Sequence, residues 1–267
     1  MSETMPDDAM RKRLMQAAIV YEKQCPRATV KHAGQKVVLE TPNRICAWRA
    51  LSYFTKEPET IAWIGEIPEG GVLFDVGANI GLYTLWASLT RRAQVFAFEP
   101  ESSSFAVLNA NLRANELTQR CRAFCVGISD RIGFGTINLA RAAPGASGHQ
   151  VNVVTRGVRP ADNAVPQGVS TTTLDHLVYE ARFPCPSHIK IDVDGIEHAI
   201  IAGGDRLLRD PRLKSVLIEI AVKIPEHRAV VDLLVDRYGF TKDTELEAQV
   251  YAKTTGVAHN GNIIFRR

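Results

Sequence analysis

The sequence predicts an α/β fold built on a mostly parallel sheet with helices on both faces. Residues 72–74 form a short apolar run that ends in Asp75, and a glycine turn at 77–81 and a helical pattern follow it. A second apolar run, 94–98, is also followed by an acid, and a third, within 188–194, carries acids near its end. Runs that are apolar throughout are typical of strands buried on both faces, as in parallel sheets.

The glycine turn and Glu99 together indicate a nucleotide-type ligand at the carboxyl edge of this sheet. A strand, a tight glycine turn and a helix build a ligand crevice there, and Gly77 and Gly81 allow the backbone to approach a ligand closely. Glu99 closes the next strand, about 20 residues past the turn, where an acid can bind both hydroxyls of a ribose. Asp75, at the first strand tip, can accept a hydrogen bond from a cationic amine.

Two cofactor classes use such a crevice, and S-adenosylmethionine fits it better than NAD. A dinucleotide site favours Gly-x-Gly-x-x-Gly because the pyrophosphate rests on a helix N-terminus. Here the turn is Gly77-Ala78-Asn79-Ile80-Gly81, which lacks the third glycine and follows an acid. S-adenosylmethionine has no phosphate, but its amino-acid end and ribose suit Asp75 and Glu99. An NAD-dependent oxidoreductase is therefore the second hypothesis.

Composition places the chain among ordinary globular proteins. Its 267 residues are 45% hydrophobic and 23% charged, with a formal net charge of +3, which permits one large α/β domain with a sizeable core. The basic clusters at 11–13 and 266–267 lack interleaved aromatic residues, so we expect no nucleic-acid partner. We find no secretion signal or membrane-length apolar run, and we expect a cytoplasmic protein.

The five cysteines do not predict a metal site. Cys121 and Cys125 lie four residues apart around an expected strand, but two thiols do not make a zinc site. The others, Cys25, Cys46 and Cys185, add no metal-binding spacing. We interpret all five as buried apolar thiols of a reducing compartment and predict no metal.

Residues 1–55 are predicted to be an N-terminal extension, and residues 56–267 the main domain. A helix is expected over 6–23 from the spacing of its apolar residues, and a short strand over 36–40. We expect this extension to pack beside the nucleotide site or to cover it. The main domain opens with a helix near Pro58, where the missing N–H costs nothing.

Alternating elements continue after Glu99. A helix is expected over 102–115 and a strand over 121–127. Ser129, just past that strand, either meets an adenine ring or is simply a turn residue. Residues 140–169 are rich in Gly, Pro and Ala and are predicted to be a long loop, which is usually functional or disordered. Its segment 147–150, with His149, either lines a substrate mouth or is plain solvated loop, and we favour the second slightly.

A second acidic segment, His188 to Glu197, completes the expected site. Strand alternation puts Lys190, Asp192 and Asp194 on one face, and a helix is expected over 196–208. Asp192 would face the same crevice as the first glycine turn, and we predict it to be the catalytic base. Asp194 and Glu197 either join it as catalytic acids or cap the following helix; a divalent-metal site is the third option. Further expected elements are a strand over 214–220, a helix around 231–235 and a last strand over 262–265.

With both segments in view, the chain resembles the FkbM-type S-adenosylmethionine-dependent methyltransferases. The matching segments keep the family's order within residues 57–266: Glu57-Pro58-Glu59-Thr60, Phe74 through Thr84, Phe98-Glu99-Pro100, Asn109 with Asn111, Thr173-Leu174-Asp175, Ile189 through Glu197, and Asn262 through Phe265. Asp194 departs from the pattern, since many members have Glu there. Within the matched motifs we expect cofactor contacts from Asp75, Gly77, Asn79, Gly81, Tyr83, Thr84, Glu99 and Asp192, and outside them from Ser129.

The resemblance implies a Rossmann-like class I methyltransferase fold with a seven-stranded sheet. It also implies O-methylation of a hydroxyl on a sugar, a glycan or a natural product, by in-line displacement. Positioning can supply roughly 7–11 kcal/mol of such catalysis, and a carboxylate at Asp192 would accept the hydroxyl proton. A non-catalytic S-adenosylmethionine-binding protein, the remaining hypothesis, would keep the cofactor residues and lose the acids of the second segment. All three acids are present.

Overall fold

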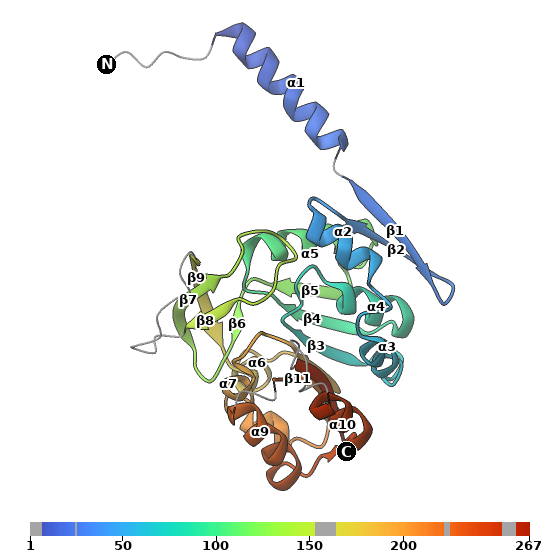
Figure 1. The fold of residues 1–267 in the computed structure, drawn as a ribbon, viewed down its shortest axis with the longest axis vertical. Helices are drawn as coiled ribbons and strands as arrows, with labels where there is room; N and C mark the ends of the chain where they lie inside the picture. The colour runs from blue at the N-terminus through green and yellow to red at the C-terminus, as the bar shows by residue number, and fades with distance from the viewer. Residues whose placement is uncertain (1–6, 25, 153–163, 222–224, 253–259) are drawn as a thin grey trace.

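The centre of the protein is a seven-stranded sheet (Figure 1) in a computed structural model that describes residues 7–24, 26–152, 164–221, 225–252 and 260–267. The strand order is β12-β13-β11-β10-β3-β4-β5. The bounds are β3 Val72–Val76, β4 Gln94–Phe98, β5 Cys121–Phe124, β10 His188–Ile191, β11 Ser215–Ala221, β12 Thr241–Lys242 and β13 Asn260–Arg266. Strands β11, β10, β3, β4 and β5 are parallel, and β13 runs antiparallel to both its neighbours. The predicted mostly parallel α/β sheet is confirmed.

Helices cover both faces of this sheet, as the apolar strands require. One face packs against α2 Arg44–Leu51, α3 Pro58–Ile64, α4 Leu82–Arg91 and α5 Ser102–Ala114. The other packs against α6 Leu174–Tyr179, α7 Glu197–Ala202, α8 Asp205–Arg209, α9 Pro225–Asp232 and the π-helix η1 Leu233–Arg237. Neighbouring side chains of β3 point to opposite faces of the sheet. Leu73 packs in the core under α2 to α5, and Phe74 packs in the core on the other face. Helix α10, Thr244–Ala252, packs beside β13.

Three predicted boundaries were wrong. The strand expected over 188–194 ends at Ile191, because the backbone turns at Asp194 and Gly195, which have φ values of 62° and 124°. The strand expected over 121–127 ends at Phe124. The helix expected over 196–208 is two helices, broken where Gly203 packs so tightly that a Cβ would lie 2.2 Å from the Ser129 carbonyl oxygen.

A second, four-stranded sheet includes residues 150–152 and 165–169 of the loop predicted over 140–169, whereas residues 140–149 connect two of its strands. It consists of β6 Gly127–Ile128, β7 Gly133–Leu139, β8 Gln150–Asn152 and β9 Val165–Thr172, in the order β6-β9-β7-β8. It lies at the side of the main sheet, next to the ends of β4 and β5 (Figure 1). The sequence did not predict this sheet because glycine and proline interrupt the alternation of apolar and polar residues in β7 and β9. Residues 153–163 of the predicted loop lie outside the described residues. Its connection from β7 to β8 contains His149.

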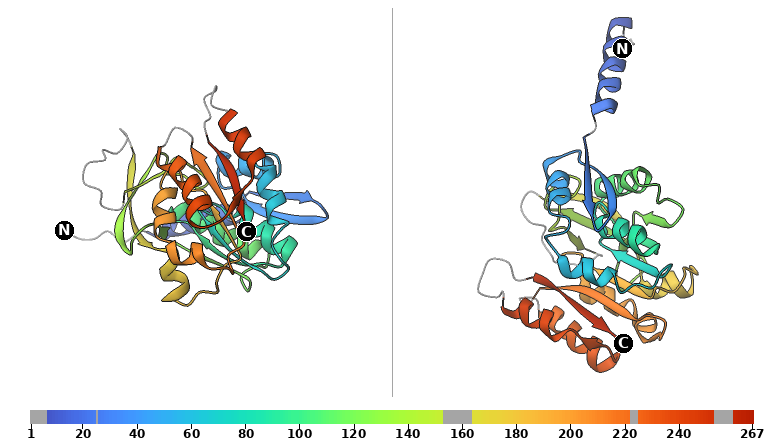
Figure 2. Two further views of the ribbon diagram at one scale, coloured as in Figure 1. Left: turned by 90° about the horizontal axis from the view of Figure 1, so that it is seen from below. Right: turned by 90° about the vertical axis from the view of Figure 1, so that its right-hand side faces the viewer.

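The N-terminal extension divides into two parts that behave differently. Helix α1, Asp8–Gln24, extends away from the body and buries none of its residues (Figures 1 and 2). The hairpin of β1 Arg27–His32 and β2 Gln35–Glu40, followed by α2, packs into the same core as α3 and α4. The hairpin and α2 thus share a core with the main domain, and the domain boundary between residues 55 and 56 stays a prediction. No helix in the described ranges combines the length and apolarity needed to cross a membrane.

Replacing Gly77 by Ala should reveal how closely β3 and β10 approach each other. Gly77 has φ 77°, and an added Cβ would lie 1.9 Å from the Asp192 carbonyl oxygen. Gly239 is a matched control, because its φ is 71° and nothing lies within 4 Å of an added Cβ. Both variants bear the left-handed backbone cost of about 1–2 kcal/mol, and Gly77→Ala should lose roughly 1–3 kcal/mol more through overpacking. Urea unfolding measures both, and equal losses would contradict the close approach.

Candidate active site

A cavity opens at the carboxyl ends of β3, β4 and β10, with about 860 Å³ of empty space including its mouth. Residues lining it include the sequence-predicted Gly77, Asn79, Glu99, Asp192 and Asp194. A smaller cavity of about 430 Å³ adjoins it and shares Gly77, Asn79 and Asp192 with the larger one. Asp192 therefore stands where the two cavities meet.

The glycine turn forms one wall, and its N–H groups are all used within the protein. The N–H groups of Gly77 and Ala78 donate to the Phe98 carbonyl oxygen, and that of Gly81 to the Ala78 carbonyl oxygen. The Asn79 N–H donates to Glu99, and that of Ile80 to the Asn79 side chain. A pyrophosphate needs free N–H groups at such a turn. The five residues 77–81 therefore do not offer a dinucleotide site.

Glu99 lies at the tip of β4 and reaches the larger cavity, as predicted from the sequence. Its Oε2 accepts from the Asn79 N–H at 2.7 Å and its Oε1 from the Glu101 N–H at 2.8 Å. These bonds fix both oxygens while each keeps further accepting capacity. Burial raises the pKa of Glu99 to about 7, although the two N–H donors act in the opposite direction.

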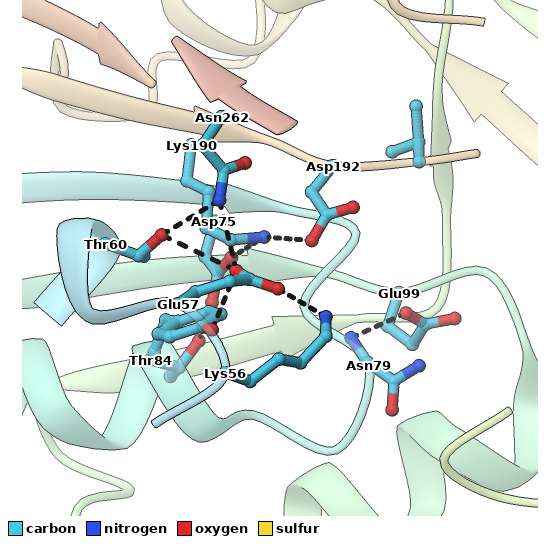
Figure 3. Close-up of polar contacts among 12 residues, drawn as sticks. Lys56, Glu57, Thr60, Asp75, Asn79, Thr84, Glu99, Lys190, Asp192 and Asn262 are labelled. Atoms are coloured by element: carbon cyan, nitrogen blue, oxygen red, sulfur yellow. Dashed lines mark hydrogen bonds and ion pairs between the residues drawn. The ribbon is translucent and has the colours of Figure 1, made fainter. Parts of the chain in front are cut away.

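Lys190 is the buried centre of charge of the site (Figure 3), and it lines the smaller cavity. Its Nζ lies 3.1 Å from Asp192 Oδ2 and 3.9 Å from Asp75 Oδ1. Burial acts to lower the pKa of Lys190, but the two carboxylates and Glu57 raise it above its ordinary value. For Asp192, burial acts to raise the pKa, but the ammonium groups of Lys190 and Lys56 hold it below the ordinary range. Asp192 is thus a permanent anion, which weakens it as a base.

Asp75, Thr84 and Gly81 line neither cavity, although the sequence suggested that they contact the cofactor. The Asp75 carboxylate is fully buried and accepts from Thr84 Oγ1 at 2.6 Å. Burial raises its pKa in spite of Lys190. Gly81 faces α5, where a Cβ would lie 2.2 Å from Leu108 Cδ1. These residues support the site from below, because side-chain alternation in β3 turns Asp75 toward Lys190 and not toward the cavity.

Tyr83 lines the smaller cavity and belongs to a network around Glu57. The Tyr83 hydroxyl donates to Glu57 Oε2 at 2.8 Å, and Lys56 pairs with Glu57 Oε1. Asn262, at the far end of the chain, donates its Nδ2 to Glu57 at 3.3 Å and to Thr60 at 3.2 Å (Figure 3). The two family-like segments at 57–60 and 262–265 are thus joined by hydrogen bonds, which the sequence did not indicate.

Asp194 and Glu197 have different surroundings. Asp194 lines the larger cavity, accepts from the Gly148 N–H at 2.7 Å, and has a pKa raised by burial and by Asp192. Glu197 is fully buried, lines neither cavity, accepts from the Gly195 N–H at 3.0 Å and lies 2.9 Å from His227 Nε2. It is therefore an ion partner of His227 that also binds the turn before α7, and it makes no side-chain cap of that helix.

Ser129 also differs from its expected place. It is buried, its hydroxyl donates to Asp130 Oδ1 at 3.2 Å, and it lines neither cavity. The segment just before it, Val126 to Ile128, lines the larger cavity instead. The early end of β5 explains the shift, because β6 carries residues 127–128 away into the second sheet.

Three polar residues that the sequence did not select also line the larger cavity: Arg49, Lys56 and Glu219. Ser147 and His149 line it as well, and His149 is only 8% exposed, so the slightly favoured expectation of a plain solvated loop was wrong for this residue. Burial raises the pKa of Glu219 to about 8, and nearby carboxylates act in the same direction. No motif indicates Arg49 or Lys56, because Arg49 lies in the N-terminal extension and Lys56 lies where the extension meets the main domain. Within the described ranges, we find no group of three or more His, Cys, Asp or Glu residues placed to hold a metal ion.

Removing the buried cation should destabilise the protein strongly. In Lys190→Met, Asp75 would keep its buried carboxyl without a countercharge, and losing one partner of a buried pair costs about 3–5 kcal/mol. The double variant Asp75→Asn, Lys190→Met should recover part of the loss because the buried charge is gone. Denaturant unfolding of both variants measures this. A single variant as stable as the parent, or a double variant less stable than the single, would contradict the pairing.

Comparisons with known proteins agree with this geometry. The family described as Methyltransferase FkbM domain matches residues 75–242. The hexuronic acid methyltransferase AglP of Haloferax volcanii is 28% identical over 203 residues, which cover 74% of this chain and 76% of AglP. The 31-O-demethyl-FK506 methyltransferase FkbM of Streptomyces tacrolimicus is 28% identical over 180 residues, 58% of this chain and 67% of that protein. The crystal structure of a methyltransferase FkbM from Methylobacillus flagellatus shares the fold, with a TM-score of 0.50 and 13% identity over 84% of this chain and 55% of that one.

Proposed function

The chain belongs to the FkbM family of methyltransferases, and on that premise we propose that it methylates a hydroxyl of a sugar, glycan or natural product with S-adenosylmethionine. The observation that carries the choice of cofactor is the closed glycine turn beside Glu99. Its N–H groups are used internally, while a buried carboxylate faces the larger cavity. A ribose-containing ligand without phosphates fits such a turn.

The two cavities suit the two ends of S-adenosylmethionine. Glu99, with apolar neighbours from Val126 to Ile128, lines the larger cavity and would hold the ribose and the base. The smaller cavity is lined by both cations and anions, among them Lys56, Glu57 and Asp192. This mixed charge suits a zwitterionic amino-acid end. When bound, the cofactor would supply a methyl group already activated on a sulfonium.

The chain's own contribution is then mainly positioning, which can supply roughly 7–11 kcal/mol. Asp192, where the cavities meet, is held as an anion by Lys190 at 3.1 Å. We assign to it the orientation of the reacting groups. Asp194, on the same wall, is oriented by the backbone of residues 148–149.

Oxygen as the acceptor atom, and a sugar or natural product as the acceptor, are supported by the relatives. One is named a hexuronic acid methyltransferase, and another is named a 31-O-demethyl-FK506 methyltransferase. The alternatives are an NAD-dependent oxidoreductase and a non-catalytic S-adenosylmethionine-binding protein. The closed turn at 77–81 disfavours the first. Asp192 and Asp194, which both line the cavity, disfavour the second.

Methyl transfer can be tested with labelled S-adenosylmethionine and a small panel of hydroxyl compounds. Methyl glucuronoside, methyl glucoside and catechol sample a sugar acid, a neutral sugar and a phenol. We expect label in at least one of them, on oxygen by mass spectrometry, and a loss of labelling in Asp192→Asn that is larger than its loss of affinity for S-adenosylhomocysteine. Label transferred only to nitrogen or carbon would contradict the proposed O-methylation, and full activity of Asp192→Asn would contradict its role.

Glu99→Gln should weaken the binding of S-adenosylhomocysteine by roughly 10–100-fold, because a hydrogen bond to a charged group is worth about 1.5–3 kcal/mol. The pKa of Glu99, about 7, adds a pH dependence. The carboxyl is protonated below this value, so the parent's affinity should fall from about pH 8 to about pH 6, while that of the variant stays flat. Asp130→Asn, at an acid that lines neither cavity, is the control in calorimetry. Parent-like affinity of Glu99→Gln would remove Glu99 from the cofactor site.

A further inference from the structure

His149 is a buried polar side chain that the structure leaves without a partner. It is 8% exposed and lines the larger cavity. Within the described part of the chain, neither ring nitrogen has a hydrogen-bond partner. A buried, unsatisfied polar atom costs about 1–3 kcal/mol. Such a cost is typical of a side chain kept for a ligand.

The segment that carries His149 is tied down on both sides of the cavity. Asn79 Nδ2, in the glycine turn, donates to the Ala146 carbonyl oxygen at 2.8 Å. The Asp194 Oδ2 accepts from the Gly148 N–H at 2.7 Å and from the His149 N–H at 3.4 Å. The segment therefore spans from the tip of β3 to the tip of β10. Asp192, where the two cavities meet, lies just past the end of β10 beneath this span.

We propose that His149 is the residue that takes up the proton of the acceptor hydroxyl during methyl transfer. This inference rests on the proposed function. The acceptor oxygen forms a bond to the methyl carbon as the carbon–sulfur bond breaks, and the electron pair of that bond remains on sulfur. The hydroxyl proton passes to a free ring nitrogen of His149 and then leaves to solvent. Asp194 lies against the His149 backbone, and its carboxylate stabilises the imidazolium.

The charges around the ring agree with this role. Burial lowers the pKa of His149, Asp194 and Glu101 raise it, and Arg49 lowers it. The lowered pKa keeps the imidazole neutral, and so able to accept a proton, at neutral pH. Other titratable groups that line the same cavity are Lys56, Glu99, Asp192 and Glu219. His149 is thus better suited to accept the proton of the acceptor hydroxyl than Asp192, which is paired with Lys190.

The first test measures the pKa of the His149 ring and requires no acceptor substrate. Sinefungin carries an ammonium-bearing carbon where S-adenosylmethionine carries its methyl-bearing sulfur, whereas S-adenosylhomocysteine has neither charge nor methyl there. We expect the ring pKa of His149, followed by NMR in the two complexes, to be lower with sinefungin by on the order of one unit, because a nearby positive charge disfavours the imidazolium. His149→Gln identifies the signal, and His176, on α6 away from both cavities, is the internal control.

Equal ring pKa values in the two complexes, with both ligands bound, would overturn this inference and leave the proposed function intact. If neither ligand binds, both proposals fail.

The second test follows turnover at saturating cofactor with an acceptor from the panel above. His149→Gln should lower kcat by about 10²–10⁴-fold with unchanged affinity for S-adenosylhomocysteine. The control His176→Gln, at a histidine that lines neither cavity, should leave kcat unchanged. The parent's kcat should fall only at acid pH, as the ring becomes protonated, and this acid limb should vanish in the variant. A normal kcat in His149→Gln would overturn the role.

Discussion

The site depends on one buried ammonium group, that of Lys190. It stands between Asp75 and Asp192, so the tips of two adjacent parallel strands are held by a single cation. A buried charge is tolerated only when it is paired. The Lys190 ammonium holds the pKa of Asp192 low, whereas burial still raises the pKa of Asp75. Asp192 therefore meets the cavities as an anion in a fixed place. The Asp192 backbone is also held close to the glycine turn, because a Cβ at Gly77 would lie 1.9 Å from the Asp192 carbonyl oxygen.

Around this centre, the cavity walls come from parts of the chain that are far apart in sequence. The N-terminal extension contributes Arg49, the junction contributes Lys56, and the inserted second sheet contributes His149 through its β7–β8 connection. Arg49 Nε donates to the Gly145 carbonyl oxygen, and Asn79 Nδ2 donates to the Ala146 carbonyl oxygen. The N-terminal extension and the glycine turn are therefore both tied to the β7–β8 connection.

The sequence predicted best what depends on short-range patterns. Strand β4 and the start of α3 at Pro58 match the expectation because apolar runs and proline at a helix start are local signals. What failed depends on contacts between distant segments. Side-chain alternation predicted that Lys190 and Asp192 lie on one face of their strand. It did not predict that Asp75 is fully buried and does not reach the cavity. Glu197 shows the same limit, since its partner His227 lies in another helix.

The most direct test of the account is calorimetric titration of the purified protein with S-adenosylhomocysteine and, separately, with NAD. The closed turn at residues 77–81, with Glu99 facing the cavity, predicts micromolar-range binding of the first ligand and none of the second. Binding of NAD without S-adenosylhomocysteine would contradict the cofactor assignment, and with it the methyl-transfer function, while leaving the fold intact.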